Sequence, residues 1–286
     1  MMEWFILSLL TALAAASQDA WVKKFFSTYN AYEMAVLPMI FSLPLLIFAV
    51  FFIEVPKLDA TFTICFLLSL PLNALCLVCY MTAIKTSPLS LTLPYLAFSP
   101  VFMILTGFLF LGERPEISGV VGIIAICTGA YILNLGNDLK HFFSPFKAII
   151  KEKGSRLMLG VALLFSILAP IGKKAIIHSS PAFFSYTFFI ALTFFLTVCF
   201  FNKINYKNIF QQPLKGVVAG VFLFCHIIFH GFAVSMVNVT YMISIKRLSI
   251  IFGIIYGRLF FGEKNTIIRM IGALIMIAGA VLITLS

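Results

Sequence analysis

The chain has 286 residues, of which 62% are hydrophobic and only 10% are charged. Soluble domains carry about 25% charged residues, so this composition excludes an ordinary soluble domain and indicates a membrane protein. The formal net charge is +10, but the Lys and Arg residues are scattered at the ends of apolar runs. We therefore interpret this charge as a signal of membrane orientation and expect no nucleic-acid partner.

Long apolar runs follow one another along the whole chain. A membrane-spanning helix needs roughly 20 mostly apolar residues, whereas barrel strands would alternate over about ten. The runs are continuous, and short turns separate them. We therefore predict an all-α membrane protein of ten transmembrane helices, at residues 3–23, 31–53, 61–84, 88–111, 115–135, 156–177, 181–201, 215–236, 238–261 and 266–285.

The sequence repeats itself at an offset of 150 residues. FLFLGERP at 108–115 aligns with RLFFGEKN at 258–265, and Lys23 aligns with Lys173. Glycines of the fifth and tenth runs align as well, which makes a chance match improbable. Because each unit has an odd number of helices, the second unit enters the membrane from the opposite side. Inverted repeats of this kind are common in secondary transporters, where the substrate site lies near the midplane between the repeats.

The repeat also predicts the domain organisation. The first five-helix unit covers residues 1–135 and the second covers 156–286. The linker at 136–155 carries Phe and Ile residues that can share one helical face, with Lys residues elsewhere. This pattern predicts an amphipathic basic segment that lies on anionic headgroups.

Each unit ends its fourth helix on a Gly-Glu pair and continues into a Gly-rich fifth helix. Together with TAIKTSPLSLTLPYLAFSPVF at 82–102, this arrangement resembles the EamA domains of the drug/metabolite transporter superfamily over essentially the whole chain. The resemblance implies a central cavity lined by the first, third, fourth, sixth, eighth and ninth helices. It also implies a carrier, because the superfamily includes amino-acid exporters, nucleotide-sugar carriers and sugar-phosphate exchangers.

Two adjacent cations, Lys246 and Arg247, lie near the middle of the ninth predicted span. A cation at the centre of a bilayer costs about 2.5–3.5 kcal/mol, and the nearer span end is roughly 13 Å away. We therefore expect both side chains to face protein or a wet cavity. Asp19 is the one acidic residue clearly inside a span, and it cannot neutralise two cations. The pair predicts an anion-binding site, and the alternative is a structural ion pair with Asp19.

The stretch IKRLSII resembles the phosphate-binding Lys-Arg pair in the ninth helix of the triose-phosphate/phosphate translocators, at these two positions only. This resemblance implies an anionic ligand. Neighbouring residues on a helix point about 100° apart, so we expect one cation to bind the ligand while the other braces the site.

Further polar residues are candidates for the cavity wall. His226 and His230 lie one turn apart and share a face, and the repeat aligns His230 with Tyr80. We predict that His226, His230, Tyr80, Tyr241 and Asp19 contact substrate, with packing or inter-helix hydrogen bonds as the alternative. The HxxxH spacing has no nearby carboxylate, so we expect no metal and no cofactor.

These observations favour a secondary transporter that moves a small organic anion, phosphorylated compounds included, by alternating access. The sequence has no Walker loop, HExxH motif or intramembrane Ser-His-Asp set of recognisable spacing, so we expect no enzyme. The alternatives are an amino-acid or other metabolite exporter, a carrier of neutral substrates, and a scaffold or lipid scramblase.

We expect a multi-pass protein of the bacterial inner (plasma) membrane, a monomer or homodimer whose partners are the bilayer and a small, anionic substrate. The positive-inside rule places both termini outside, whereas the family resemblance implies the reverse, so the orientation stays open.

Overall fold

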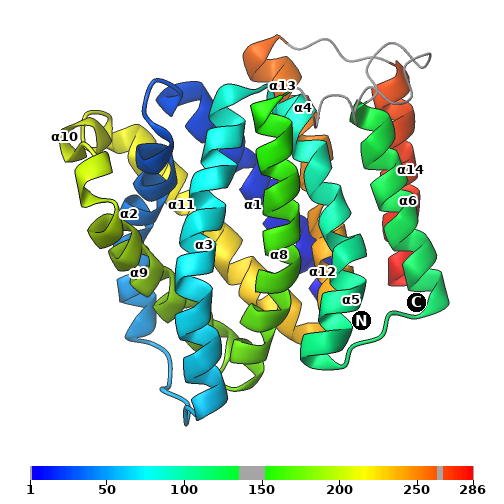
Figure 1. Cartoon of the computed structure of the whole chain (residues 1–286), viewed down its shortest axis with the longest axis horizontal. Helices are drawn as coiled ribbons and strands as arrows, with labels where there is room; N and C mark the ends of the chain where they lie inside the picture. Colours follow the sequence, from blue (N-terminus) through cyan, green and yellow to red (C-terminus); the bar gives the residue numbers. More distant parts are fainter. Residues whose placement is uncertain (1, 135–151, 263–266, 286) are drawn as a thin grey trace.

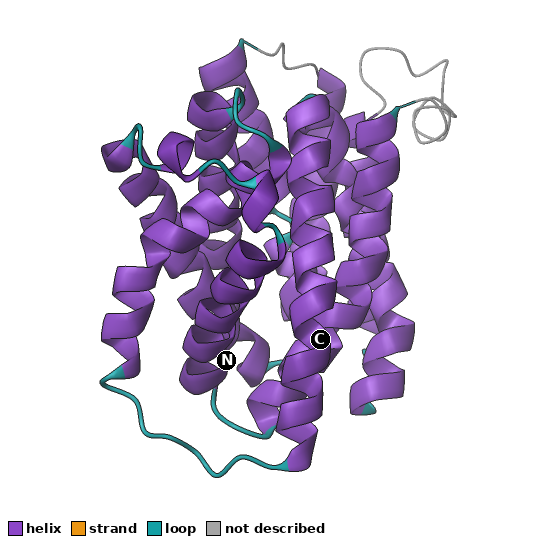
Figure 2. Cartoon of the chain, turned by 60° about the vertical axis from the view of Figure 1, so that its left-hand side comes forward, coloured by secondary structure: helices purple, strands orange, loops and turns teal. Residues whose placement is uncertain are grey.

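The computed structural model describes residues 2–134, 152–262 and 267–285, and nearly all of the amphipathic segment expected at 136–155 lies outside these ranges. Helices and short connections make up the described residues, which contain no strand (Figures 1 and 2). The helices of the first half are α1 (Glu3–Phe26), α2 (Ala31–Val50), α3 (Ala60–Thr86), α4 (Leu89–Thr92), η1 (Leu93–Phe98), α5 (Ser99–Leu111) and α6 (Ile117–Asn134).

The second half repeats this order of long and interrupted helices. It comprises α8 (Lys153–Ile177), α9 (Pro181–Cys199), η3 (Phe201–Lys203), α10 (Tyr206–Ile209), α11 (Pro213–Met236), α12 (Val239–Lys246), α13 (Ser249–Phe261) and α14 (Ile267–Thr284). Helix α8 begins at Lys153, three residues before the predicted sixth span.

Eight helical stretches are long and apolar enough to cross a membrane. They are Glu3–Phe26, Ala31–Val50, Ala60–Thr86, Leu93–Leu111, Lys153–Ile177, Pro181–Cys199, Pro213–Met236 and Val239–Phe261. The apolar stretches described in α6 and α14 are shorter, Ile117–Leu133 and Met270–Thr284. The total of ten spans therefore stays a prediction.

Local chemistry sets where several helices begin and end. Asn30 caps α2 by accepting the Glu33 backbone N–H, while the Glu33 carboxylate accepts the Asn30 N–H, which forms a capping box. Gly112 and Gly262 end α5 and α13 with φ of 70° and 65°, a conformation that glycine adopts without strain. These two glycines are equivalent under the repeat, so both units use the same stop signal.

Regular α-helical geometry is interrupted within the fourth and ninth spans, predicted at 88–111 and 238–261. In the ninth span, α12 ends at Lys246 and α13 begins at Ser249. The Leu248 and Ile251 backbone N–H groups bond to carbonyls three residues back rather than four, at 2.9 Å each. The equivalent break in the fourth span separates η1 from α5, which begins at Ser99. Both breaks therefore lie at the same place in the repeat.

The break gives the two cations a different setting from that of a regular helix. Lys246 closes α12 and Arg247 follows as its C-cap. The C-terminal end of a helix carries partial negative charge, so cations are favoured there. The discontinuous helix thus offsets part of the cost of placing charge in the middle of the ninth span.

Helices α6 and α14 pack closely against each other at one side of the bundle (Figure 1). A Cβ added at Gly122 would lie 2.6 Å from the Gly279 carbonyl oxygen, and one at Gly129 would lie 2.5 Å from that of Gly272. Sequence alignment pairs Gly122 with Gly272, whereas space pairs it with Gly279. This exchange is what a two-fold relation between antiparallel repeats produces.

We expect Gly129→Ala to lower the free energy of unfolding by about 1–3 kcal/mol, because the new methyl group would meet backbone that cannot move aside. Gly160→Ala is the matched control, since nothing lies within 4 Å of a Cβ there and helix propensity favours alanine. Denaturation of both variants in detergent micelles measures the difference. Equal stability of the two variants would contradict the close approach of α6 and α14.

The ends of α3 and α8 meet outside the spans. Asp59 caps α3 by accepting the Phe62 backbone N–H at 2.8 Å, and its second oxygen lies 2.6 Å from His178 Nδ1. The Phe62 hydrogen bond is the main cause that holds the pKa of Asp59 below its ordinary value of 3.8, and His178 lowers this pKa further. A carboxylate whose pKa is lowered by folding stabilises the folded protein at pH values above its ordinary pKa of 3.8. This stabilisation is lost as the pH falls through the lower pKa of the folded state.

We therefore expect the melting temperature of the wild type to fall more steeply than that of Asp59→Asn as the pH drops below 3.8. Asparagine retains the N-cap but carries no charge to protonate. Thermal melts from neutral pH into this acid range test the prediction. The same acid slope in both proteins would show that Asp59 makes no such contribution.

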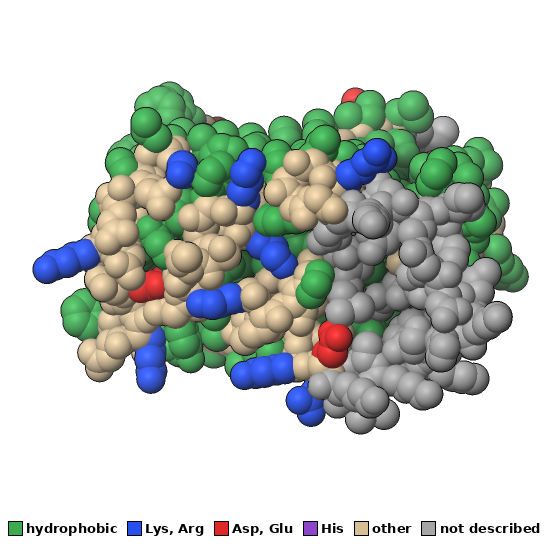
Figure 3. Space-filling model, turned by 90° about the horizontal axis from the view of Figure 1, so that it is seen from above, with side chains coloured by type: hydrophobic (Ala, Val, Ile, Leu, Met, Phe, Trp, Pro, Cys, Tyr) green, Lys and Arg blue, Asp and Glu red, His purple; other side chains and the backbone are tan. Residues whose placement is uncertain are grey.

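Basic side chains gather at one end of the bundle. Viewed from above, this end shows a spread of Lys and Arg side chains (Figure 3). The last turns of α1, α3, η3 and α10 contribute Lys23, Lys24, Lys85, Lys203 and Lys207. The positive-inside rule favours a cytoplasmic location for this end, whereas the family resemblance implies the reverse, so the orientation stays open.

Candidate functional site

A cavity of about 190 Å³ lies between the two repeats. Its lining residues come from α1, α3, η1, α8, α9, α11, α12 and α13. This set includes every span that the family resemblance implied, and the seventh span, α9, in addition. Six of the seven residues predicted from the sequence line it: Asp19, Tyr80, His226, His230, Lys246 and Arg247.

Tyr241 is the predicted site residue that the structure places elsewhere. Its hydroxyl accepts the Glu116 backbone N–H at 2.7 Å, at the start of α6. The same hydroxyl occupies the space where Gly119 would carry a Cβ. Tyr241 therefore joins α12 to α6, and the residue that leaves room for it is a glycine.

Arg247 is held in place by the other repeat. Its Nε and Nη2 donate to the Ser99 hydroxyl at 3.0 and 2.6 Å, and its guanidinium lies 5.7 Å from the centre of the Phe165 ring. Only 5% of the residue is exposed. Ser99 begins α5, directly after the break in the fourth span. Arg247 thus links the two helix breaks, and two of its three guanidinium nitrogens already donate to Ser99.

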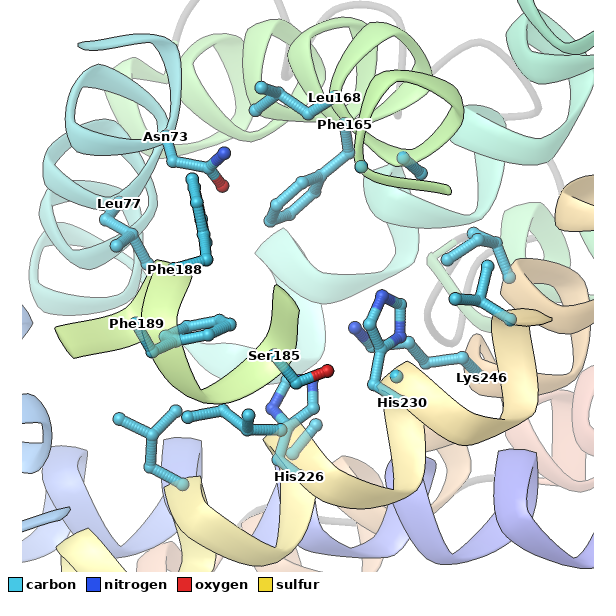
Figure 4. Close-up of a pocket in the computed structure, with 18 of the residues that line it drawn as sticks. Asn73, Leu77, Phe165, Leu168, Ser185, Phe188, Phe189, His226, His230 and Lys246 are labelled. Carbon is cyan, nitrogen blue, oxygen red and sulfur yellow. The ribbon is translucent and has the colours of Figure 1, made fainter. Parts of the chain in front are cut away.

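Lys246 differs from Arg247 because it has no such partner. In the described part of the chain, the ion pairs are Lys173–Glu113 and His178–Asp59, and no hydrogen bond involves the Lys246 ammonium. Figure 4 shows Lys246 beside His230 at the cavity. A cation in this position is available to a ligand.

Asp19 bonds to Tyr80 rather than to either cation. The Tyr80 hydroxyl donates to the Asp19 carboxylate, and both residues line the cavity. Asp19 is 7% exposed, so the carboxylate is largely enclosed by protein. The ion pair of Asp19 with Lys246 or Arg247, which was the alternative to an anion-binding site, does not occur as a salt bridge among the described residues.

Several polar atoms at the cavity have no hydrogen-bond partner among the described residues. They are Gln18 Oε1, Ser69 Oγ and His230 Nδ1, all buried. The His226 and His230 rings lie 6.1 Å apart, nearly perpendicular to each other. Buried polar groups are normally satisfied, so these atoms are available to a bound molecule or to water. Ser69 was not singled out from the sequence as a cavity residue.

Lys173 also lines the cavity, but its charge is balanced. Its Nζ forms an ion pair with Glu113 and donates to the Val237 carbonyl at 2.6 Å. Glu113 in turn accepts the Val239 N–H, the first of α12, at 2.8 Å. Setting this pair aside, the charged lining residues are Lys246, Arg247 and Asp19. The cavity therefore holds one more cation than carboxylates.

No three His, Cys, Asp or Glu side chains gather to hold a metal ion within the described ranges. The cavity groups are cations, one unpaired carboxylate, neutral polar groups and aromatic rings, a set suited to an organic ligand.

Two helical repeats around a cavity lined with charged residues define a membrane protein of the transporter type. The model of the EamA-like transporter family matches residues 2–135 and 152–285, and the chain belongs to this family. It is an integral, multi-pass membrane protein. The likeness of the Lys246-Arg247 pair to the triose-phosphate/phosphate translocators stays a prediction.

A solved structure, described only as the crystal structure of a protein, is similar to this chain with a TM-score of 0.66 and 14% sequence identity, over 96% of each chain. At this identity the likeness concerns the fold alone. The comparison with curated proteins gave no match.

Proposed function

We propose that the protein is a secondary transporter that moves a small organic anion across the membrane by alternating access. The observation that carries this proposal is Lys246, a partly buried cation at the cavity with no ion-pair partner in the described chain. An unpaired charge away from water is costly, and an anion that binds there offsets this cost. Phosphate esters and carboxylates are both included.

Binding at this place can be coupled to a change of conformation. The cavity lies between the repeats, and Arg247 on one repeat bonds to Ser99 on the other. A ligand shifts the equilibrium between inward-open and outward-open states only if its affinity differs between them. An anion held between the two helix breaks contacts both repeats, so its affinity depends on how they are placed.

Purified protein provides the first test. Thermal stability is measured with panels of phosphate esters, carboxylates, amino acids and organic cations, on the wild type and on Lys246→Gln/Arg247→Gln. A ligand that binds the folded protein raises its melting temperature. We expect anions to stabilise the wild type and not the variant. Anions that stabilise neither protein, or both equally, contradict the proposal. Uptake of the best ligand into liposomes then tests transport itself.

A second candidate is an amino-acid exporter, and Asp19 is the observation that favours it. Asp19 lines the same cavity as Lys246, so a zwitterion could place its carboxylate at Lys246 and its ammonium group at Asp19. If amino acids stabilise the wild type and Asp19→Asn abolishes this stabilisation, the amino-acid exporter is favoured. If Asp19→Asn still binds anions as the wild type does, the anion transporter is favoured.

The remaining alternatives are separated by the same preparation. A carrier of neutral substrates would bind its ligand regardless of the Lys246-Arg247 pair. A lipid scramblase would move a fluorescent lipid between leaflets of the liposome without any small anion. We propose the bacterial inner membrane as the location, and a monomer or homodimer as the working form.

A further inference from the structure

The cavity has two chemically different sides. The side formed by α1, α11 and α12 carries Asp19, His226, His230 and Lys246. On the other side, side chains from α3, α8 and α9 present an apolar wall: Leu77, Phe165, Leu168, Phe188 and Phe189. Figure 4 shows these aromatic and aliphatic side chains across the open space from Lys246 and His230. A ligand that fills the space meets a charged group at one end and rings at the other.

The apolar wall offers few hydrogen bonds. The polar lining residues of these three helices are Ser69, Asn73, Tyr80, Lys173 and Ser185. Tyr80 and Lys173 already donate to Asp19 and Glu113, and the Asn73 amide donates to the Ser69 carbonyl at 3.0 Å. Each ligand hydroxyl buried without a partner lowers affinity by roughly tenfold. A sugar-like body carries several hydroxyls, so this wall disfavours it. An aromatic or aliphatic body loses no hydrogen bonds there and gains contact with the rings.

The net charge and the volume of the cavity narrow the class of ligand further. Beyond the Lys173–Glu113 pair, the lining charges are Lys246 and Arg247 against Asp19, which leaves an excess of one positive charge. The cavity measures about 190 Å³. An apolar cavity of roughly 150 Å³ holds a benzene molecule. One ring with one small anionic group therefore matches both measures.

We propose that the substrate is an amphipathic anion: a single carboxylate or phosphate group at Lys246 joined to a compact aromatic or aliphatic body against Phe165 and Phe189. This inference rests on the proposed anion transport and selects among anions. It separates the protein from carriers of polyhydroxylated anions such as sugar phosphates, because the far wall has few groups that can pair with their hydroxyls.

Ligand pairs with the same head group test the class. Phenyl phosphate is compared with glycerol phosphate, and phenylacetate with glycerate, by thermal stabilisation and titration calorimetry on the purified wild-type protein. We expect the ring-bearing member of each pair to bind at least roughly tenfold more tightly. Tighter binding of glycerol phosphate or glycerate overturns the inference.

Variants of α9 provide a matched comparison. Phe189 lines the cavity, whereas Phe194 on the same helix is 71% exposed on the outer surface. We expect Phe189→Ala to weaken phenyl phosphate binding roughly tenfold or more and to leave inorganic phosphate unchanged. Phe194→Ala should change neither. Phe189→Leu serves if the alanine variant does not fold, and it should keep most of the affinity. Equal effects of the two positions overturn the inference.

The two levels of the proposal fail differently. If no anion binds in a way that depends on Lys246, the proposed function fails. If anions bind through Lys246 but ring-bearing anions bind no more tightly than hydroxylated ones, the proposed function stands and the amphipathic substrate class is wrong.

Discussion

We expect Glu113→Gln to lower the free energy of unfolding by about 3–5 kcal/mol, because it leaves a buried lysine without its counter-ion. Lys173 is 6% exposed, so water cannot replace the lost carboxylate. The glutamine still accepts the Val239 N–H through its amide oxygen, so the loss reports mainly on charge. The effect is large because Glu113 comes from the first repeat and both of its partners come from the second.

A double-mutant cycle isolates this pair. Lys173→Met/Glu113→Gln removes both charges and should recover most of the stability, since replacing a buried ion pair by apolar groups is often neutral. Glu54→Gln, in the exposed connection between α2 and α3, controls for the loss of a carboxylate anywhere. Denaturation in detergent micelles measures the wild type, the two single variants Glu113→Gln and Lys173→Met, the double variant and the Glu54→Gln control. If Glu113→Gln is as stable as Glu54→Gln, the pair does not hold the repeats together.

Composition and the internal repeat were enough to predict most of the fold. Apolar runs of membrane length place the long helices, because length and hydropathy are properties of the sequence alone. Gly122 and Gly129 aligned with Gly272 and Gly279, and the structure shows why glycine stands there: the α6 and α14 backbones touch at these residues. The sequence alignment pointed to these residues, but the crosswise pairing appears only in three dimensions.

The helix breaks could not be read from the same signals. Hydropathy stays high through residues 238–261, and nothing in that average distinguishes a regular helix from one interrupted at Arg247 and Leu248. The role of Ser99 was hidden for a related reason. A serine separated from Arg247 by 148 residues gives no local signal, although it is the repeat counterpart of Ser249 beside the ninth-span break.

The site residues also fall into those that the sequence could identify and those that only the structure shows. Rarity identified Asp19, Lys246 and Arg247, because charges inside spans are costly and need a reason. Tyr241 lies on α12, as Lys246 does, and only the direction of its side chain excludes it from the cavity. The apolar wall was missed because Phe residues are abundant in this chain, with 33 in total, so none of them stands out by residue type.

The second large effect separates the two cations. We expect Lys246→Met to weaken anion binding on the order of a hundredfold or more, because it removes the charge that faces the ligand. Without ligand, this variant should be at least as stable as the wild type, since it removes a cation that has no ion-pair partner in the described chain. Lys57→Met, on the exposed connection before α3, is the control for loss of a lysine.

Ser99→Ala should behave in the opposite way. It removes the hydroxyl that accepts from Arg247 Nε and Nη2, and so leaves a buried guanidinium without acceptor. We expect a loss of about 1.5–3 kcal/mol in unfolding free energy, the range for hydrogen bonds to charged groups, while anions still bind at Lys246. Calorimetry and denaturation on the same preparations separate the two effects. A Ser99→Ala protein as stable as the wild type would contradict the bracing role of Arg247. A Lys246→Met protein with wild-type affinity would contradict the role of Lys246 as the ligand contact.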